Sequence, residues 1–143
     1  MIVWRERVRP DWVDYNGHLN DGYYAVIFGH ATDEVLDRVG LDASYREAND
    51  SSLYTVEQHL RYLAEVPPDA EVEVRSTAIG GSAKLLRLWH ELWFDDTLRA
   101  TAEVLGVHVT GRRSAPFPDE IVQRIASVRV DAPAEAGGSI RAI

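Results

Sequence analysis

The feature of this chain that most constrains its fold is a change in the spacing of its apolar residues. From about Gly22 to Val39 they recur at the spacing of one helix face, and Gly40 follows where a left-handed cap is favoured. After residue 51 the spacing changes to two, which is typical of strands that bury one face. A strand over residues 4–9, one long helix and a run of antiparallel strands therefore predict an α+β fold, with the helix on one face of the sheet.

The chain after the long helix is predicted to form further strands and a short helix. Residues 41–51 are polar and predict a loop that has room for one short helical turn. Strands are expected over residues 54–62, 71–76, 84–94 and 98–110, with turns at Pro67-Pro68-Asp69, Gly80-Gly81 and Asp95-Asp96. In the first of these strands, Tyr54 and Tyr62 are expected on one face, and Glu57, His59 and Arg61 on the other. Pro116-Phe117-Pro118 leads into a helix predicted over residues 119–127.

Length and composition bound the class of protein. The 143 residues fit a single domain, expected over residues 1–130, followed by a tail over 131–143 that is rich in Ala, Gly and Pro and expected to be loose. The net charge of −8 argues against nucleic-acid binding, which depends on basic surface. The chain has no cysteine, which excludes disulfides, thiolate metal sites and a cysteine nucleophile. It has no apolar run of membrane-spanning length and no signal-peptide pattern, so we expect a cytoplasmic protein without a membrane partner.

The segment from Asp14 to Asp21 carries an unusual concentration of functional groups just before the long helix. It contains carboxylates, two amides, an imidazole and a glycine, and aromatic residues surround it: Trp12, Tyr15, Tyr23 and Tyr24. Polar groups at the beginning of a helix often bind a carbonyl or an anion, because the first helical N–H groups are unpaired and carry partial positive charge. Asn, Gly and Asp also favour turns and caps for backbone reasons alone, which is the structural alternative.

This segment resembles the signature of acyl-CoA thioesterases of the hotdog superfamily, which includes the 4-hydroxybenzoyl-CoA thioesterases. That signature is an aspartate, two or three residues, then Gly-His-Val-Asn-Asn, and here it reads Asp14-Tyr15-Asn16-Gly17-His18-Leu19-Asn20-Asp21. Four stretches are similar to a narrower group, the betainyl-CoA thioesterases of carnitine breakdown: residues 12–18, 28–33, 54–63 and 88–92. The resemblance covers about residues 8–117. It implies a hotdog fold, in which an antiparallel sheet of about five strands wraps one long central helix, and hydrolysis of an acyl-CoA thioester.

The resemblance also implies the catalytic residues. The chain has no cysteine and no Gly-x-Ser-x-Gly motif, so a carboxylate has to activate the reaction. Asp14 matches the catalytic aspartate of the family, either as the nucleophile or as the base that activates water. Asn16 and His18 are expected to orient the water or the carbonyl, and backbone N–H groups after Gly17 to stabilise the oxyanion. Glu57 is a second catalytic candidate, since a hotdog dimer brings its strand near the helix start of the other subunit.

The remaining site residues are predicted to bind the substrate. A trimethylammonium acyl group is attracted to aromatic faces by roughly 0.5–2 kcal/mol each. The candidate substrate-binding residues are Trp12, Tyr15, Gly17, Asn20, Tyr24, His59, Tyr62 and Trp89, and the candidates for the CoA phosphates are Lys84, Arg112 and Arg113. The spacing of the histidines suggests no metal site, and the hydrolysis needs no cofactor.

Several questions stay open at the level of the sequence. The acyl group could be betainyl, another short-chain group or an aromatic one, and a non-catalytic acyl-CoA binding module or a hydratase of the same fold are alternatives. A homodimer or homotetramer is expected, because Trp89 and Trp93 lie on the sheet face that the helix does not cover. In the betainyl group the domain is also found fused behind an L-carnitine dehydrogenase, so a dehydrogenase partner of this chain is expected to be a separate protein.

Overall fold

The computed structural model describes residues 1–138 and residue 140. The strands are β1 Ile2–Arg7, β2 Ser51–Tyr62, β3 Glu71–Gly81, β4 Leu85–Phe94, β5 Thr97–Thr110 and β6 Arg113–Ser114. The helices are α1 Asp21–Val39, α2 Ala43–Asn49 and α3 Asp119–Ser127, with a short 3-10 turn over Pro10–Trp12. Within the described residues, no helix is long and apolar enough to cross a membrane.

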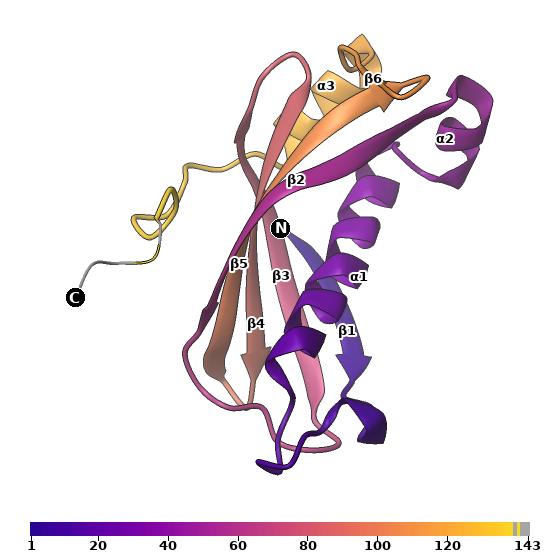
Figure 1. The fold of residues 1–143 in the computed structure, drawn as a ribbon. Coiled ribbons are helices and arrows are strands. Elements are labelled where there is room, and N and C mark those ends of the chain that lie inside the picture. Colours follow the sequence, from indigo (N-terminus) through magenta and orange to yellow (C-terminus); the bar gives the residue numbers. More distant parts are fainter. Residues whose placement is uncertain (139, 141–143) are drawn as a thin grey trace.

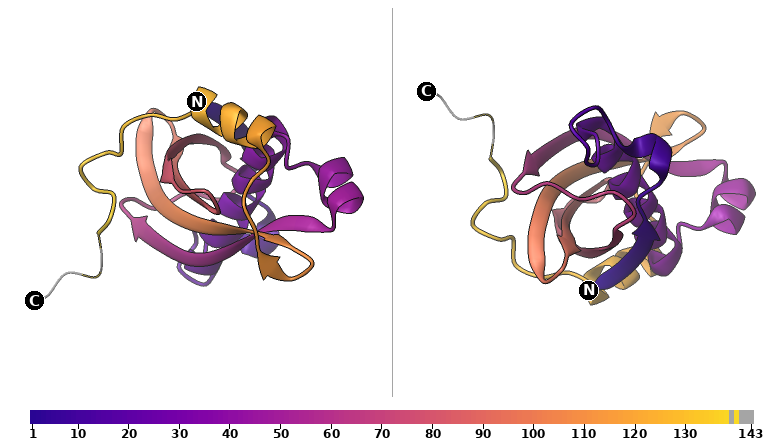
Figure 2. Two further views of the ribbon diagram at one scale, coloured as in Figure 1. Left: turned by 90° about the horizontal axis from the view of Figure 1, so that it is seen from above. Right: turned by 90° about the horizontal axis from the view of Figure 1, so that it is seen from below.

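The strands form one antiparallel sheet that curls around α1. The strand order is β1-β3-β4-β5-β2, and the short β6 pairs with β5. Figure 1 shows α1 lying across the concave face, and the end-on views of Figure 2 show the sheet bending around the helix. This arrangement is the hotdog fold, and it confirms the predicted α+β architecture with one long central helix.

Helix α1 begins and ends where the sequence predicts. Its N-cap residue Asn20 accepts a hydrogen bond from the Gly22 N–H at 3.0 Å, and its C-cap Gly40 has a φ of 91°, a left-handed conformation that suits glycine. The buried helix residues are those whose spacing predicted the helix: Tyr24, Ile27, Phe28, Ala31, Val35, Leu36 and Val39. They pack against the concave side of the sheet, which fixes the position of the first helical turn relative to the strand ends.

Strand β2 differs from the expected regular alternation. A β-bulge between Thr55 and Glu57 leaves Val56 as an extra residue in the strand. Before the bulge, Tyr54 pairs with Val107, and after it Tyr62 pairs with Ala100, so these two tyrosines lie on opposite faces of the sheet. The prediction that they share a face was wrong, because one inserted residue reverses the alternation.

One short helix and the ends of two strands also differ from the predictions. The segment expected as a loop contains a complete helix, α2, whose N-cap Asp42 accepts a hydrogen bond from the Tyr45 N–H at 2.9 Å. Strand β1 ends at Arg7, ahead of Pro10, and β3 continues to Gly81 beyond the expected end at residue 76. Helix α3 occupies the predicted range.

The convex face of the sheet is partly covered by the chain itself. The Val130 N–H donates to the Ala78 carbonyl at 2.9 Å, and the Gly137 N–H donates to Glu103 Oε2 at 2.6 Å. Trp89, on this face, is only 7% exposed. The boundary at residue 130 and the looseness of the tail stay predictions, and residues 139 and 141–143 lie outside the described part of the chain.

Candidate active site

A cavity of about 450 Å³ opens between the loop that precedes α1 and the end of β2. Its lining contains most of the predicted site residues. It is formed by Asp14, Tyr15, Asn16, His18, Leu19, Asn20, Asp21, Tyr24, Tyr62, Leu63, Ala64 and Glu65. The structure therefore brings the signature segment together with a strand end some forty residues later in the chain.

The loop before α1 is a tight turn that presents polar side chains to this cavity. The Gly17 N–H donates to the Asp14 carbonyl at 2.9 Å, and the Asp14 N–H donates to the His18 carbonyl at 3.2 Å. Gly17 has a φ of 80°, which is the reason the turn needs a glycine there. The contribution of Gly17 is thus to the backbone shape of the loop.

Asp14 is held by one hydrogen bond to each carboxylate oxygen. Oδ1 accepts from the Asn16 N–H at 2.9 Å, and Oδ2 accepts from Asn20 Nδ2 at 3.1 Å. Because Asn20 is also the N-cap of α1, the same side chain fixes the carboxylate relative to the helix start. The carboxylate is therefore oriented before any substrate binds, as a base or nucleophile requires.

Tyr24 and Tyr62 form one wall of the cavity. Their ring centroids are 5.0 Å apart and the rings are nearly perpendicular, at 88°. Tyr24 is 3% exposed and Tyr62 is 52% exposed, and Tyr62 Oη donates to the Asp21 carbonyl at 3.1 Å. Burial raises the pKa of both phenols, and the nearby carboxylates of Glu65 and Asp21 raise the pKa of Tyr24 and Tyr62 respectively, so both rings stay neutral at physiological pH.

Residues 63–65, which sequence reasoning missed, complete the lining. The Leu63 and Ala64 N–H groups both donate to the Arg99 carbonyl, at 2.9 and 3.0 Å, which turns the chain back beneath the cavity. Glu65 Oε2 then lies 3.7 Å from His18 Nε2. The only signal in the sequence was that these residues directly follow Tyr62.

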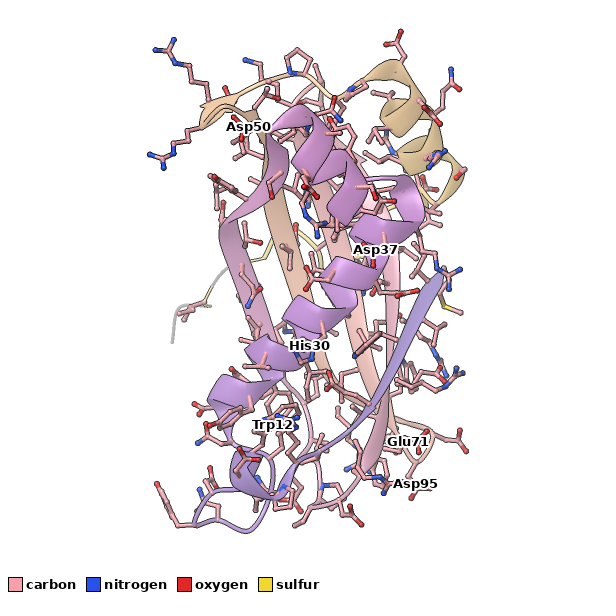
Figure 3. The ribbon with its side chains drawn as sticks, turned by 90° about the vertical axis from the view of Figure 1, so that its right-hand side faces the viewer. Trp12, His30, Asp37, Asp50, Glu71 and Asp95 are labelled. Carbon is pink, nitrogen blue, oxygen red and sulfur yellow. The ribbon has the colours of Figure 1, made fainter. Side chains whose placement is uncertain are left out.

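Several predicted site residues lie outside this cavity. Trp12 is buried and stacks on Tyr23, with ring centroids 5.6 Å apart, so it supports the loop beside the beginning of α1 (Figure 3). Trp89 lies on the convex face, in a second hollow of about 410 Å³ with Arg61 and Glu91. Glu57 and His59 are also on the convex side, where they line a small hollow beside Glu103.

Most of the backbone N–H groups expected as oxyanion donors are already hydrogen-bonded. The N–H groups of Gly17, Leu19 and Asn20 already donate to the carbonyls of Asp14, Val66 and Trp12, each at 2.9 Å. Within the described part of the chain, the His18 N–H is the loop donor between residues 17 and 20 that has no hydrogen-bond partner.

The basic residues predicted for the CoA phosphates lie far from the cavity within one chain. Arg113 is in β6 and Arg112 in the turn before it, and Lys84 Nζ donates to Ser114 Oγ at 3.5 Å. Figure 1 places β6 at the opposite end of the sheet from the loop that precedes α1.

Three histidines outside the cavity, His30, His90 and His108, have structural partners. His90 lies between Ser76 and Thr32, and His108 between Tyr45 and the Ala115 carbonyl. His30 Nδ1 lies 2.7 Å from Glu6 Oε1, on the side of α1 shown in Figure 3. Among the residues that the structure describes, no group of three or more histidines and carboxylates is placed to hold a metal ion.

The chain is similar to several known proteins. A betainyl-CoA thioesterase from Pseudomonas aeruginosa is 44% identical over 129 residues, which are 87% of this chain and 81% of that protein. An L-carnitine dehydrogenase/betainyl-CoA thioesterase from Agrobacterium fabrum is 38% identical over 95% of this chain, which corresponds to 29% of that longer protein. A solved structure from Staphylococcus aureus, a hypothetical protein in complex with CoA, superposes with a TM-score of 0.90 at 26% identity, covering 99% of this chain and 95% of that one.

The fold and the cavity define a hotdog protein with an oriented carboxylate at the start of its central helix. Residues 8–125 match the thioesterase-like superfamily, which is most of the chain. The chain belongs to that superfamily.

Proposed function

We propose that this protein hydrolyses an acyl-CoA thioester, and that its substrate is betainyl-CoA, which it cleaves to glycine betaine and CoA in carnitine breakdown. The observation that carries the proposal is the Asp14 carboxylate, held by Asn16 and Asn20 at the wall of the cavity. The identity of 44% to a betainyl-CoA thioesterase over most of both chains supports the choice of acyl group.

In the proposed mechanism, Asp14 promotes hydrolysis of the thioester by one of two routes. As a base, Asp14 takes a proton from water while the resulting hydroxide adds to the carbonyl carbon; the C–S bond then breaks and the CoA sulfur receives that proton. As a nucleophile, Asp14 forms a mixed anhydride and releases the CoA thiolate, which is protonated by solvent, and water then cleaves the anhydride. In both routes we assign the His18 N–H and the positive end of α1 to the oxyanion, and the His18 and Asn16 side chains to orienting the reactants. Single turnover in ¹⁸O water labels the Asp14 side chain only if the anhydride forms and water attacks its aspartyl carbon, so label on Asp14 establishes the nucleophilic route.

The proposal includes a dimer, or a dimer of dimers. Strand β2 is an edge of the sheet and exposes Tyr54, Val56 and Tyr62, so a second copy can extend the sheet there. In such a dimer Glu57 and His59 would serve the partner's cavity, and the basic residues at the far end could reach CoA bound across the two subunits. The two-part relatives support a pathway link to an L-carnitine dehydrogenase, and we propose the cytoplasm as the compartment.

Two alternatives are separated from the proposal by one assay. A generic acyl-CoA thioesterase would cleave short-chain or aromatic acyl-CoAs as well as betainyl-CoA, whereas a non-catalytic binding module would cleave none. Release of free CoA thiol, followed colorimetrically over a panel of acyl-CoAs, distinguishes the three.

The test of the catalytic assignment is Asp14→Asn. This substitution keeps the shape of the side chain and removes the base or nucleophile, so we expect kcat to fall by at least about 100-fold. Asp11→Asn is the matched control, because Asp11 is an exposed aspartate outside the cavity lining. A folded Asp14→Asn protein with near-normal turnover would remove Asp14 from the mechanism.

A further inference from the structure

The cavity beside Asp14 has an unusual balance of charge. Of its lining residues, Asp14, Asp21 and Glu65 are acidic, and His18 is the one side chain with a basic group. No lysine or arginine lines it among the described residues. A cavity of this kind repels an anionic acyl group and attracts a cationic one.

Aromatic rings stand in the same cavity. Tyr24 is buried and presents its ring at 88° to that of Tyr62, whose ring is half exposed. The hydrogen bond from Tyr62 Oη to the Asp21 carbonyl anchors the Tyr62 ring over the first turn of α1. Two fixed, perpendicular rings leave a corner in which the methyl groups of a quaternary ammonium can lie against aromatic carbon.

The chemistry of the proposed substrate restricts where such a cation can bind. The quaternary nitrogen of a betainyl group is only two bonds from the carbonyl carbon that reacts. The rings that recognise it must therefore lie in the cavity that contains Asp14. Tyr15, Tyr24 and Tyr62 meet this condition, whereas Trp12 and Trp89 do not line that cavity. Tyr15 is 96% exposed, so Tyr24 and Tyr62 supply the packed rings.

From this geometry we infer that Tyr24, Tyr62 and Glu65 form the subsite that recognises a quaternary ammonium on the acyl group. The inference rests on the proposed thioesterase function and adds the residues that set its specificity. The rings contact the methyl groups, and the Glu65 carboxylate, with that of Asp21, supplies the opposite charge. Glu65 Oε2 lies 3.7 Å from His18 Nε2, so the carboxylate is close to the loop that holds Asp14.

The experiment compares two substrates that differ in one atom. Betainyl-CoA carries a trimethylammonium group, and tert-butylacetyl-CoA carries carbon in place of the nitrogen, so the second keeps the bulk and removes the charge. We expect the wild-type protein to prefer betainyl-CoA in kcat/KM by at least about 10-fold, the range of a cation against two aromatic faces.

Three substitutions then distinguish the contribution of the Tyr62 ring to this preference from that of the Glu65 charge. Tyr62→Leu should reduce that preference by about 5-fold or more, while Tyr62→Phe, which keeps the ring, should retain most of it. Glu65→Gln should lower kcat/KM for betainyl-CoA by a severalfold larger factor than for tert-butylacetyl-CoA. Glu47→Gln, an exposed glutamate in α2, is the matched control and should change neither substrate.

The outcomes distinguish the subsite from the proposed function. If both substrates are cleaved equally well, or if Tyr62→Leu lowers both rates by the same factor, the subsite is refuted and a thioesterase remains. If neither thioester is cleaved, the proposed function fails, and the subsite is then judged by binding of tetramethylammonium. Its methyl NMR signal should broaden with the wild-type protein and not with Tyr62→Leu, and equal broadening with both would overturn the inference.

Discussion

At the scale of single residues, the candidate site depends on Asn20 in two ways. Its Oδ1 accepts the Gly22 N–H at 3.0 Å and so begins α1, while its Nδ2 donates to Asp14 Oδ2 at 3.1 Å. One amide therefore links the helix start to the carboxylate that we propose as catalytic. The two functions use different atoms, so a substitution can remove one and keep the other.

The substitution Asn20→Asp keeps the cap of α1 and removes the hydrogen bond to Asp14. An aspartate caps a helix as well as an asparagine does, so the unfolding temperature should change little. The donor to Asp14 is lost and a second carboxylate takes its place, which should lower kcat by about 10-fold or more. Measuring kcat alongside thermal unfolding tests this, and an unchanged kcat would contradict a role for Asn20 in positioning Asp14.

The residues of the site that could be predicted from the sequence are those that lie close together along it. Asp14, Asn16, His18 and Asn20 fall within seven positions, so one motif identified them all. Glu65 could not be found in this way, because its place in the cavity depends on how the chain turns after β2 against Arg99. Which of the N–H groups after Gly17 are already hydrogen-bonded could not be predicted for a related reason, since acceptors such as the Val66 carbonyl are distant in sequence.

At the scale of elements, His90 connects the central helix to the sheet. It lies in β4, is fully buried, and places Nδ1 2.6 Å from Ser76 Oγ on β3 and Nε2 3.0 Å from Thr32 Oγ1 on α1. Because Thr32 Oγ1 donates to the Phe28 carbonyl, it accepts from His90 Nε2–H, and Ser76 donates to Nδ1. This network accommodates a neutral imidazole that carries its proton on Nε2.

The burial of His90 predicts a pH dependence of stability. Desolvation lowers its pKa from 6.5 to about 4 in the folded protein. The unfolded chain therefore binds a proton below pH 6.5 that the folded protein does not, so the stabilisation is present above pH 6.5 and is lost as the pH falls toward 4. A shift of this size corresponds to about 3 kcal/mol. By urea unfolding, the wild type should have a higher free energy of unfolding than His90→Gln at pH 7.5, and this difference should become smaller by pH 4.5. A difference that does not change with pH would contradict the assignment.

Among the elements, α1 was predictable because each of its signals is local. The apolar spacing, the Asn20 cap and the Gly40 terminator can all be read within twenty-one residues. The bulge at Val56 could not be predicted, because it is defined by the register of β2 against β5 some fifty residues later. Its consequence is large, since it determines which β2 side chains reach the cavity and which face outward.

At the scale of the whole molecule, the reason to expect a dimer changes once the structure is known. The two tryptophans on the convex face do not require a partner subunit to cover them. The segment after Val130 lies beside Trp89, and the Arg75 guanidinium lies 4.5 Å from the centroid of the Trp93 ring. The feature that a partner would cover is instead the open edge of β2, where Tyr54 and Val56 are at least half exposed. Glu57 follows this exposed stretch, outside the cavity of its own chain.

The last prediction tests whether the partner completes the site. Glu57→Gln and Asp14→Asn should each lose most activity as purified homodimers. If Glu57 acts on the cavity of the other subunit, a mixed dimer of the two variants has one site with both carboxylates intact. After subunit exchange half of the dimers are mixed, so activity should recover to about a quarter of the wild-type value. Thiol release before and after mixing measures this, with each variant incubated alone as the control and light scattering to establish the dimer. No recovery despite exchange would show that Glu57 does not act across the interface, and a fully active Glu57→Gln homodimer would remove Glu57 from the reaction altogether.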